Sequence, residues 1–276
     1  MRIGVAAFVT ATALVVAPAA GNEGAVQASR SSNSPETIMS VATRPGVTQS
    51  FVLVRPDRDP VGSVVLFSGG GGNLRLAQRR TLDGHTNFLV RNRQRFVAHG
   101  FVVAVVDAPS DRATHGLTLF RSTAGHAQDV QAVIEALRRL SPAPVWLVGT
   151  SMGTVSAANA AARLAGGPAA PDGLVLSSSV TRPSRRERES LSDVRLGAVA
   201  VPTLIVHHKD DACPVTPHRD AAGLARDLKA APRVEVVTIE GGDPAQSAPC
   251  EPLSPHGFFG LDAAVVDRIA RWMGAP

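Results

Sequence analysis

One stretch of the chain decides its fold, and it reads Pro144-Val145-Trp146-Leu147-Val148-Gly149-Thr150-Ser151-Met152-Gly153. Residues 145–148 are consecutive apolar residues, which is typical of a short strand buried on both faces. Residues 154–164 follow directly, and their small, alanine-rich composition favours a helix. The pattern Gly-x-Ser-x-Gly, at Gly149, Ser151 and Gly153, therefore lies between a strand and a helix.

This order predicts a nucleophile elbow, a strand-to-helix turn that exposes a serine hydroxyl. The turn is so tight that its central residue is strained, and side chains two residues before or after it would collide. Gly149 and Gly153 meet that requirement around Ser151. The N–H groups at the helix start then face any oxyanion formed nearby. The alternative is an ordinary turn in which Ser151 only caps the helix.

Outside this stretch, apolar runs alternate with helical patterns. The expected strands are residues 51–55, 61–67, 101–106, 173–177, 201–207 and 234–239, and the expected helices are 88–99, 128–140, 217–228 and 258–273. Continuous apolar runs indicate a mostly parallel central sheet with helices on both faces, a three-layer α/β fold. In such sheets ligands bind beyond the carboxyl ends of the strands.

Length and composition indicate a single globular domain. The chain has 276 residues, of which 44% are hydrophobic, and we place the domain at residues 48–276. Residues 21–47 show no period and predict a flexible lead-in. The net charge is +5, but the arginines are scattered and no nucleic-acid motif is present, so we expect no nucleic-acid partner. The small cluster at residues 182–188 fits a solvated face, with an anionic surface as the alternative.

The first twenty residues predict a secretory signal peptide. Arg2 precedes an uncharged apolar run, residues 3–16, and small residues at Ala19 and Ala20 suit cleavage, with Ala28 as a second possible site. The run is short for a membrane span, so we expect no stable span after cleavage, although a retained anchor is the alternative. We therefore expect a periplasmic or secreted protein.

The chain contains two cysteines, Cys213 and Cys250. An exported protein meets an oxidising compartment, so an even pair predicts one disulfide. Two free buried thiols are the alternative. The spacing does not fit a metal site, and we expect neither a metal nor a cofactor.

Activation of a serine hydroxyl requires a base, and the base requires an orienting carboxylate. On this scaffold the order along the chain is serine, acid, histidine. Asp210 and Asp211 follow a buried strand, and we favour Asp211 as the acid. His256, in a Pro- and Gly-rich loop before the last helix, is our candidate base.

Other histidines are weaker candidates for the base. His207 and His208 belong to the strand that carries the acid, and we do not expect them to reach Ser151. The remaining candidates are expected at the surface or in loops, with His115 as a candidate pocket residue: His85, His99, His115 and His126. We also expect that a Cys213–Cys250 bridge would tie the acid loop to the loop that carries His256.

An oxyanion formed at Ser151 needs backbone N–H donors held in place beforehand. One donor is expected from Met152 and the other from Gly70 or Gly71, in the glycine run 69–72 after a buried strand. A phosphate-binding loop is excluded because no Gly-Lys-Ser/Thr follows, and Leu74 occupies the third glycine position of a dinucleotide motif.

Taken together, these motifs resemble the α/β-hydrolase family over roughly residues 50–275, most of all its small exported members. The matching segments are residues 67–72, 149–153, 211–213, 249–250 and 255–258. The resemblance implies an eight-stranded sheet, a Ser–His–Asp triad and hydrolysis through an acyl-enzyme. Two features depart from the family: His208 replaces a usual glycine in the acid loop, and only about twenty residues, 180–201, stand where a cap is usually inserted.

The sequence therefore predicts an exported serine hydrolase that cleaves carboxylic esters of small acyl substrates. A peptidase or a thioesterase would use the same triad. A catalytically inactive binding protein on the same fold is the alternative from another class.

Overall fold

The computed structural model describes Met1 and residues 33–185 and 188–274. Residues from Asn33 onward form one compact unit. Apart from Met1, the predicted signal peptide at residues 1–20 lies outside the described residues, as does the first part of the predicted lead-in. Among the described helices, none combines the length and the apolar character needed to cross a membrane.

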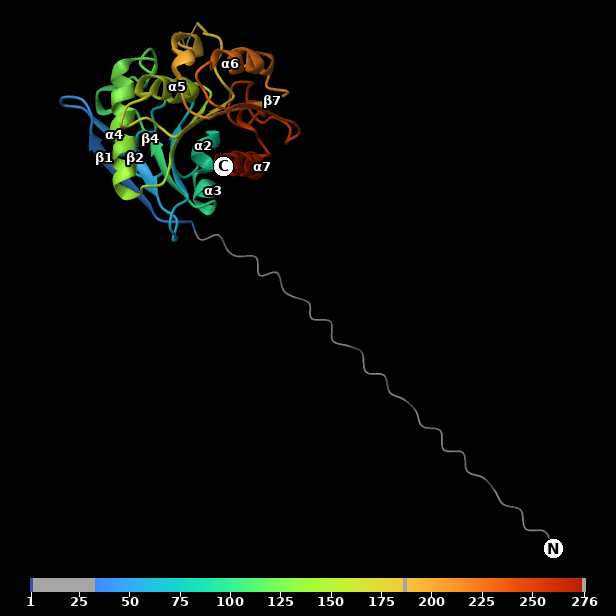
Figure 1. Cartoon of the computed structure of the whole chain (residues 1–276). Coiled ribbons are helices and arrows are strands. Elements are labelled where there is room, and N and C mark those ends of the chain that lie inside the picture. Colours follow the sequence, from blue (N-terminus) through green and yellow to red (C-terminus); the bar gives the residue numbers. More distant parts are fainter. Residues whose placement is uncertain (2–32, 186–187, 275–276) are drawn as a thin grey trace. The chain divides into compact units, whose positions relative to one another are not determined.

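The centre of the unit is an eight-stranded sheet in the order β1-β2-β4-β3-β5-β6-β7-β8. Figure 1 labels β1, β2, β4 and β7 of this sheet. β1 and β2 are antiparallel to each other and β2 is antiparallel to β4, whereas every pairing from β4 to β8 is parallel. The strands are β1 (Glu36–Ala42), β2 (Thr48–Val54), β3 (Gly62–Phe67), β4 (Phe101–Val106), β5 (Val145–Thr150), β6 (Gly173–Ser177), β7 (Thr203–His208) and β8 (Val234–Ile239). The predicted mostly parallel sheet is confirmed.

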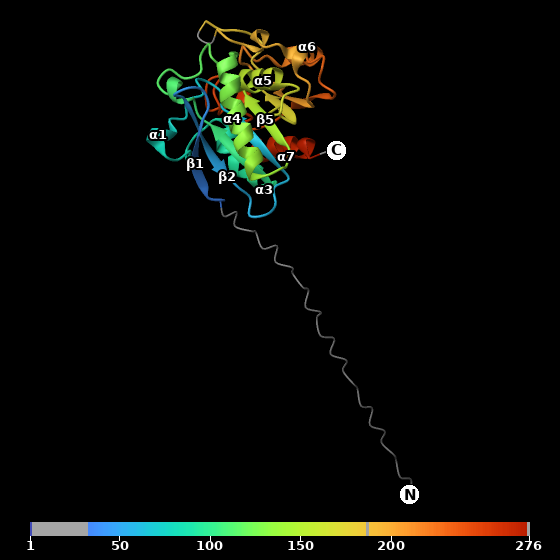
Figure 2. The same cartoon turned by 60° about the vertical axis from the view of Figure 1, so that its left-hand side comes forward.

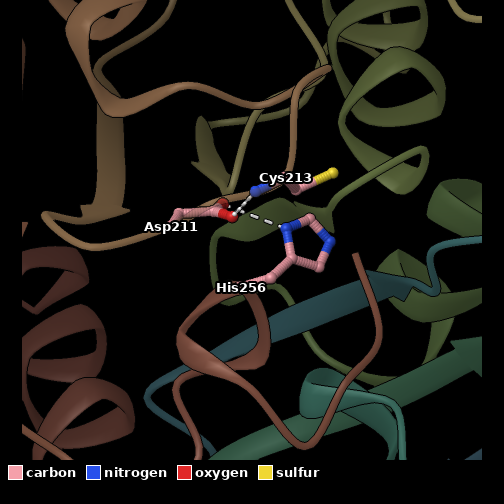
Figure 3. A group of neighbouring side chains, drawn as sticks. All are labelled: Asp211, Cys213 and His256. Atoms are coloured by element: carbon pink, nitrogen blue, oxygen red, sulfur yellow. Dashed lines mark hydrogen bonds and ion pairs between the residues drawn. The ribbon is translucent and has the colours of Figure 1, made fainter. Parts of the chain in front are cut away.

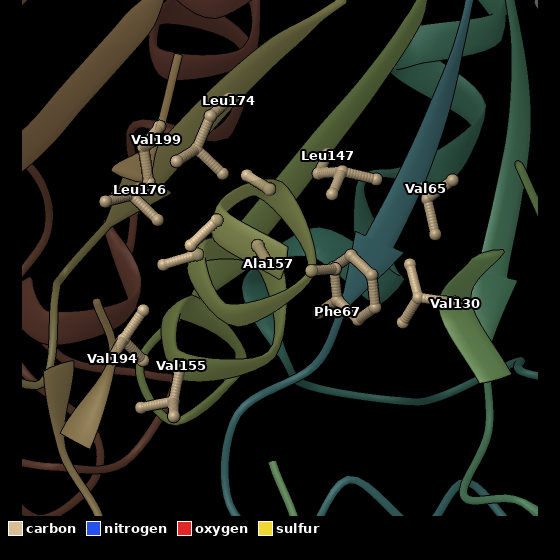
Figure 4. Close-up of a cluster of buried hydrophobic side chains, with 14 of the residues drawn as sticks. Val65, Phe67, Val130, Leu147, Val155, Ala157, Leu174, Leu176, Val194 and Val199 are labelled. Carbon is tan, nitrogen blue, oxygen red and sulfur yellow. The ribbon is translucent and has the colours of Figure 1, made fainter. Parts of the chain in front are cut away.

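Helices cover both faces of the sheet (Figure 2). Alternate strand residues point to opposite faces. Val65 and Phe67 belong to a hydrophobic cluster that also includes residues of α4, α5 and α6, and Figure 4 shows part of it. Val64 and Leu66 belong to a second cluster, with residues of α2, α3 and α7. The helices are α1 (Leu76–Arg79), α2 (Phe88–Arg91), α3 (Arg93–Ala98), α4 (Ala124–Leu140), α5 (Gly153–Leu164), α6 (Ala221–Asp227) and α7 (Asp262–Met273).

Three predicted helices are shorter or more broken than expected. The helix expected at 217–228 is a 3₁₀ turn, His218–Asp220, followed by α6, and local chemistry explains the other two differences. The helix expected at 88–99 divides at Asn92, whose side-chain amide donates to the carbonyl of Phe88 at 2.9 Å and competes with regular helical bonding. The final helix begins at Asp262 instead of residue 258, because Phe258 and Gly260 have left-handed φ values of 55° and 81°.

The predicted flexible lead-in at 21–47 is wrong for its last part, because β1 (Glu36–Ala42) is a paired edge strand. The turn after β1 is tied to α4 by Asp129, which is fully buried. Asp129 accepts hydrogen bonds from Thr43 at 2.6 Å and from Nε of Arg44 at 2.9 Å. A buried carboxylate needs such partners, so this segment belongs to the folded unit.

The parallel strands bring the motifs of the sequence to one edge of the sheet. β3, β5, β6 and β7 are neighbours, and the register pairs Phe67 with Gly149 and Thr150 with Ser177. The loops that follow β3, β5 and β7 therefore leave the sheet side by side. Between β6 and β7, the described residues include only two short 3₁₀ turns, Leu191–Asp193 and Leu196–Ala198.

Candidate active site

Ser151 occupies a strained turn between β5 and α5, as the glycine pattern requires. Its φ is 51°, a left-handed value that is uncommon for a residue with a side chain. A Cβ on Gly149 would lie 2.4 Å from the carbonyl oxygen of Gly153. A Cβ on Gly153 would lie 2.1 Å from the carbonyl oxygen of Phe67. Gly149 is therefore needed for the turn to close, and Gly153 for the turn to pack against the end of β3.

The glycine run after β3 approaches Ser151 through Gly69. A Cβ built on Gly69 would lie 2.9 Å from Cβ of Ser151. A Cβ built on Gly70 or on Gly71 would have no atom within 4 Å. Gly69, Gly70, Gly71 and Met152 all line the same cavity as Ser151. The backbone N–H groups proposed for the oxyanion thus belong to cavity-lining residues, and Gly69, which the sequence analysis did not single out, makes the close approach.

Asp211, in the loop after β7, is the acid that meets His256 (Figure 3). Its Oδ2 lies 3.0 Å from Nδ1 of His256, and its Oδ1 accepts a hydrogen bond from the N–H of Cys213 at 2.9 Å. Asp210 is exposed, and its N–H donates to His208. The geometry therefore selects Asp211 over Asp210 as the partner of the imidazole.

Thr216 is a third member of this hydrogen-bonded group, and the sequence analysis did not include it. Its hydroxyl donates to Oδ2 of Asp211 at 2.8 Å and lies 3.1 Å from Nδ1 of His256. Two oxygen atoms thus face Nδ1, which favours the tautomer with its proton on that nitrogen. Nε2 is then left with a free lone pair, the form that a general base requires.

The loop that carries His256 is held from two sides. The hydroxyl of Ser178, after β6, donates to the carbonyl of His256 at 2.7 Å. Arg91 of α2 donates to the carbonyl of Gly257 at 2.7 Å and forms an ion pair with Asp262 at 2.8 Å. These contacts hold the loop in place, and the side chain of His256 is 5% exposed.

Ser151 and His256 line one cavity of about 470 Å³. Its apolar lining includes Phe88, Val180 and Val215, and its polar lining includes Asn87 and Arg182. The volume lies within the range of pockets that bind small molecules. A serine hydroxyl and an imidazole base thus open onto the same space.

Three other histidines do not serve as the base: His207 and His208 make structural hydrogen bonds, and His115 lies outside the cavity lining. His207 is buried and its Nε2 accepts from the N–H of Ser179 at 3.0 Å, and His208 bonds to the carbonyl of Gly241 at 2.9 Å. Burial lowers the pKa of His207 to about 4. His115 is exposed and is not among the residues that line the cavity, so its predicted place there is wrong.

Two of the histidines expected at the surface or in loops are not simple surface residues. His126 lies in α4 and is 1% exposed, and burial lowers its pKa to about 3, with Arg121 and Arg44 adding repulsion. His85 is half-buried and lines the cavity. Burial also lowers the pKa of His85, and the charges of Arg79 and Arg93 add to the shift.

The predicted disulfide between Cys213 and Cys250 is present. Both cysteines line the cavity, and the bond joins the loop of Asp211 to the loop of His256. Asp211, Cys213 and His256 lie together, but the sulfur of Cys213 is held in the disulfide and is not a thiolate ligand.

Arg121 is a buried cation that the sequence analysis did not single out. Its Nη2 donates to the carbonyls of Gly70 at 2.9 Å and Ser68 at 3.2 Å, and its Nη1 donates to the hydroxyl of Ser156 in α5 at 2.7 Å. The guanidinium therefore ties the glycine loop to the helix that follows Ser151. With these carbonyls held by one side chain, the loop has a defined backbone orientation.

Comparisons with solved structures agree with this architecture. A lid-less α/β serine hydrolase from Xanthomonas campestris aligns over 87% of this chain and 96% of its own, with 17% identity and a TM-score of 0.57. An esterase from Pyrococcus furiosus aligns over 87% and 91%, with 13% identity and a TM-score of 0.56. A cold-adapted esterase from an Arctic intertidal metagenomic library aligns over 87% and 94%, with 17% identity and a TM-score of 0.57.

No protein-family model and no curated protein sequence matches the chain. The structural likeness is therefore one of fold, at an identity too low to transfer an activity. The strand order, the elbow after β5 and these alignments agree, and the chain has the α/β-hydrolase fold.

Proposed function

We propose that this protein is a serine hydrolase that cleaves small carboxylic esters through an acyl-enzyme. The observation that carries the proposal is the hydrogen bond from the buried Asp211 to His256, which lines one cavity together with Ser151. The esterases and serine hydrolases that share the fold support the same class of reaction.

In the first half of the reaction, Oγ of Ser151 attacks the acyl carbonyl while Nε2 of His256 takes the hydroxyl proton. Asp211 and Thr216 hold the proton on Nδ1 and stabilise the imidazolium that forms. The N–H of Met152 and an N–H of Gly70 or Gly71 donate hydrogen bonds to the carbonyl oxygen and stabilise its negative charge. When the tetrahedral intermediate collapses, Nε2 returns the proton to the leaving alcohol.

In the second half, a water molecule attacks the acyl group bonded to Ser151, and His256 again accepts the proton and then returns it to Oγ of Ser151. The short segment between β6 and β7 and the cavity of about 470 Å³ support small acyl substrates. The Xanthomonas campestris neighbour is likewise described as lid-less.

Covalent labelling by a fluorophosphonate tests the proposal. The purified wild-type protein should be labelled at Ser151, and both Ser151→Ala and His256→Ala should abolish the label. A folded wild-type protein that is never labelled and cleaves no ester would contradict the proposal and would favour a binding protein. A series of p-nitrophenyl esters of rising chain length, with a thioester and a peptide amide beside them, then separates esterase, thioesterase and peptidase.

We further infer that the protein is exported to the periplasm or secreted. The signal-like residues 1–20 and the Cys213–Cys250 disulfide, which persists in oxidising compartments, support this location. Cell fractionation with determination of the mature N-terminus tests it. A full-length chain retained with free thiols in the cytoplasm would contradict it.

A further inference from the structure

Asn87 lines the cavity and has a polar side chain, yet it has no role in the reaction proposed above. It precedes α2 as the N-cap residue and lines the cavity with Ser151. Its Oδ1 accepts hydrogen bonds from the backbone N–H groups of Leu89 at 3.2 Å and Val90 at 3.4 Å. Because two donors occupy this oxygen, the amide orientation is set, and Nδ2 points away from the helix.

The amide nitrogen of Asn87 lies where the glycine loop meets the nucleophile. A Cβ built on Gly69 would lie 3.5 Å from Nδ2 of Asn87, 2.9 Å from Cβ of Ser151 and 3.3 Å from the carbonyl oxygen of Thr150. Gly69, Ser151 and Asn87 therefore converge on one small region at the cavity wall. Gly69 and Ser151 directly precede Gly70 and Met152, whose backbone N–H groups are candidates for binding the oxyanion.

The segment that carries Asn87 is held in place. Nη1 of Arg91 donates to the carbonyl of Thr86 at 2.6 Å, while its Nη2 donates to the carbonyl of Gly257 at 2.7 Å. The same guanidinium thus fixes the residue before Asn87 and the residue after His256. Donors held in advance are the ones that stabilise a developing charge most, because they need no reorganisation during the reaction.

We propose that Nδ2 of Asn87 is a side-chain donor of the oxyanion hole and acts together with the backbone N–H groups. The inference rests on the proposed function, since it assigns a residue to the same acyl-transfer step. An amide NH₂ beside the attacked carbonyl donates to the oxygen more strongly once that oxygen carries a negative charge. It therefore lowers the barrier more than it strengthens substrate binding.

A purely structural role for Asn87, as the cap of α2, makes a different prediction. Serine and aspartate cap helices about as well as asparagine, but neither has an NH₂ group. If Asn87 donates to the oxyanion, Asn87→Ser and Asn87→Asp should keep the wild-type Tm yet lower kcat by about 100-fold or more with little change in KM. Asn87→Ala should lose both the activity and part of the Tm.

A second cap provides the matched control. Thr123 caps α4 by accepting from the N–H of His126 at 3.2 Å, and it does not line the cavity. Thr123→Ala should lower the Tm and leave kcat unchanged. A loss of kcat in this variant that matched the loss in Asn87→Ser would mean that destabilisation alone reduces activity, and would overturn the proposal.

The measurements use short-chain p-nitrophenyl esters and a boronic acid, whose tetrahedral adduct with serine resembles the intermediate. Asn87→Ser should weaken the binding of the boronic acid by the same factor by which it lowers kcat/KM. Wild-type kcat in Asn87→Ser would overturn the role of Asn87 while leaving the hydrolase proposal intact. Absence of fluorophosphonate labelling in the wild type would instead remove the proposed function, and this inference with it.

Discussion

Oδ2 of Asp211 lies 3.0 Å from Nδ1 of His256, and their side chains are 0% and 5% exposed. This contact joins a loop after β7 to a loop before α7, two segments that are distant in sequence. A carboxylate at this position keeps the imidazole in one orientation and tautomer.

Asp211→Asn should preserve the fold and nearly abolish ester hydrolysis. The amide keeps the size of the carboxylate but cannot stabilise the imidazolium, and it favours the wrong tautomer of His256. We expect kcat to fall by about 10⁴-fold. The neighbouring Asp210→Asn is the matched control, since Asp210 is exposed and should retain near wild-type kcat. Equal losses in the two variants would contradict the assignment of the acid.

Gly69→Ala should impair activity much more than Gly71→Ala. The new methyl of Gly69→Ala would lie 2.9 Å from Cβ of Ser151, whereas the methyl of Gly71→Ala meets no atom within 4 Å. Ser151 or the loop must then shift, and displaced donors cost about 10²-fold or more in rate. Steady-state kinetics of both variants on one ester decide the point. Wild-type kinetics in Gly69→Ala would show that the close approach does not matter.

Removal of the disulfide should destabilise the protein and loosen the acid–base pair. The bond closes a loop with a sequence separation of 37, for which chain entropy implies a stabilisation of about 3–4 kcal/mol. The Cys213→Ser/Cys250→Ser double variant should therefore unfold at lower denaturant concentration, with reduced kcat. Thiol titration of the unreduced wild-type protein should detect no free thiol. Two titratable thiols in the denatured, unreduced chain would show that the bond does not form.

The stability of the fold should decrease as the pH falls from about 6.5 towards 4. His126 has a pKa lowered to about 3 in the folded protein because it is buried, while the unfolded chain titrates at the ordinary value of 6.5. Between these values the unfolded state binds more protons, so acid favours unfolding. One pKa unit corresponds to about 1.4 kcal/mol, and the loss due to His126 at pH 4.5 should be about 2–3 kcal/mol.

Urea unfolding at pH 7 and pH 4.5 tests this prediction. The difference in unfolding free energy between the two pH values should shrink in His126→Gln. It should remain as in the wild type in His115→Gln, because His115 is exposed. Equal pH dependence in wild type and His126→Gln would be the contrary result. His207, with a pKa lowered to about 4, contributes in the same direction.

Most strands could be predicted because buried parallel strands are continuous apolar runs, as at Val145–Thr150. β1 escaped prediction for the opposite reason. Its segment Glu36–Ala42 lies at the sheet edge with mostly exposed side chains, so its sequence carries polar residues and no apolar run. Only the pairing with β2 reveals it. His126 was misplaced because the sequence does not show that the aromatic rings of Phe67 and Phe120 surround it.

The candidate site was predictable where local spacing dictates it and unpredictable where distant loops meet. The elbow around Ser151 follows from steric needs within five residues. The sequence favoured Asp211 over Asp210, but only the hydrogen bond between Asp211 and His256 distinguishes the two, since adjacent loop residues differ only in direction. The contacts of Thr216, Arg121 and Asn87 join segments that are remote along the chain, so no pattern in the sequence marks them.

The guanidinium of Arg91 binds the carbonyls of Thr86 and Gly257, and so one side chain anchors the histidine loop and the start of α2 as a single frame. The cavity wall at residues 180–184 arises from a different part of the chain, between β6 and β7. Apart from the hydroxyl of Ser178, which binds the carbonyl of His256, reaction geometry and substrate fit therefore depend on different segments. Redesign of that wall should redirect the choice of acyl group while the frame stays in place.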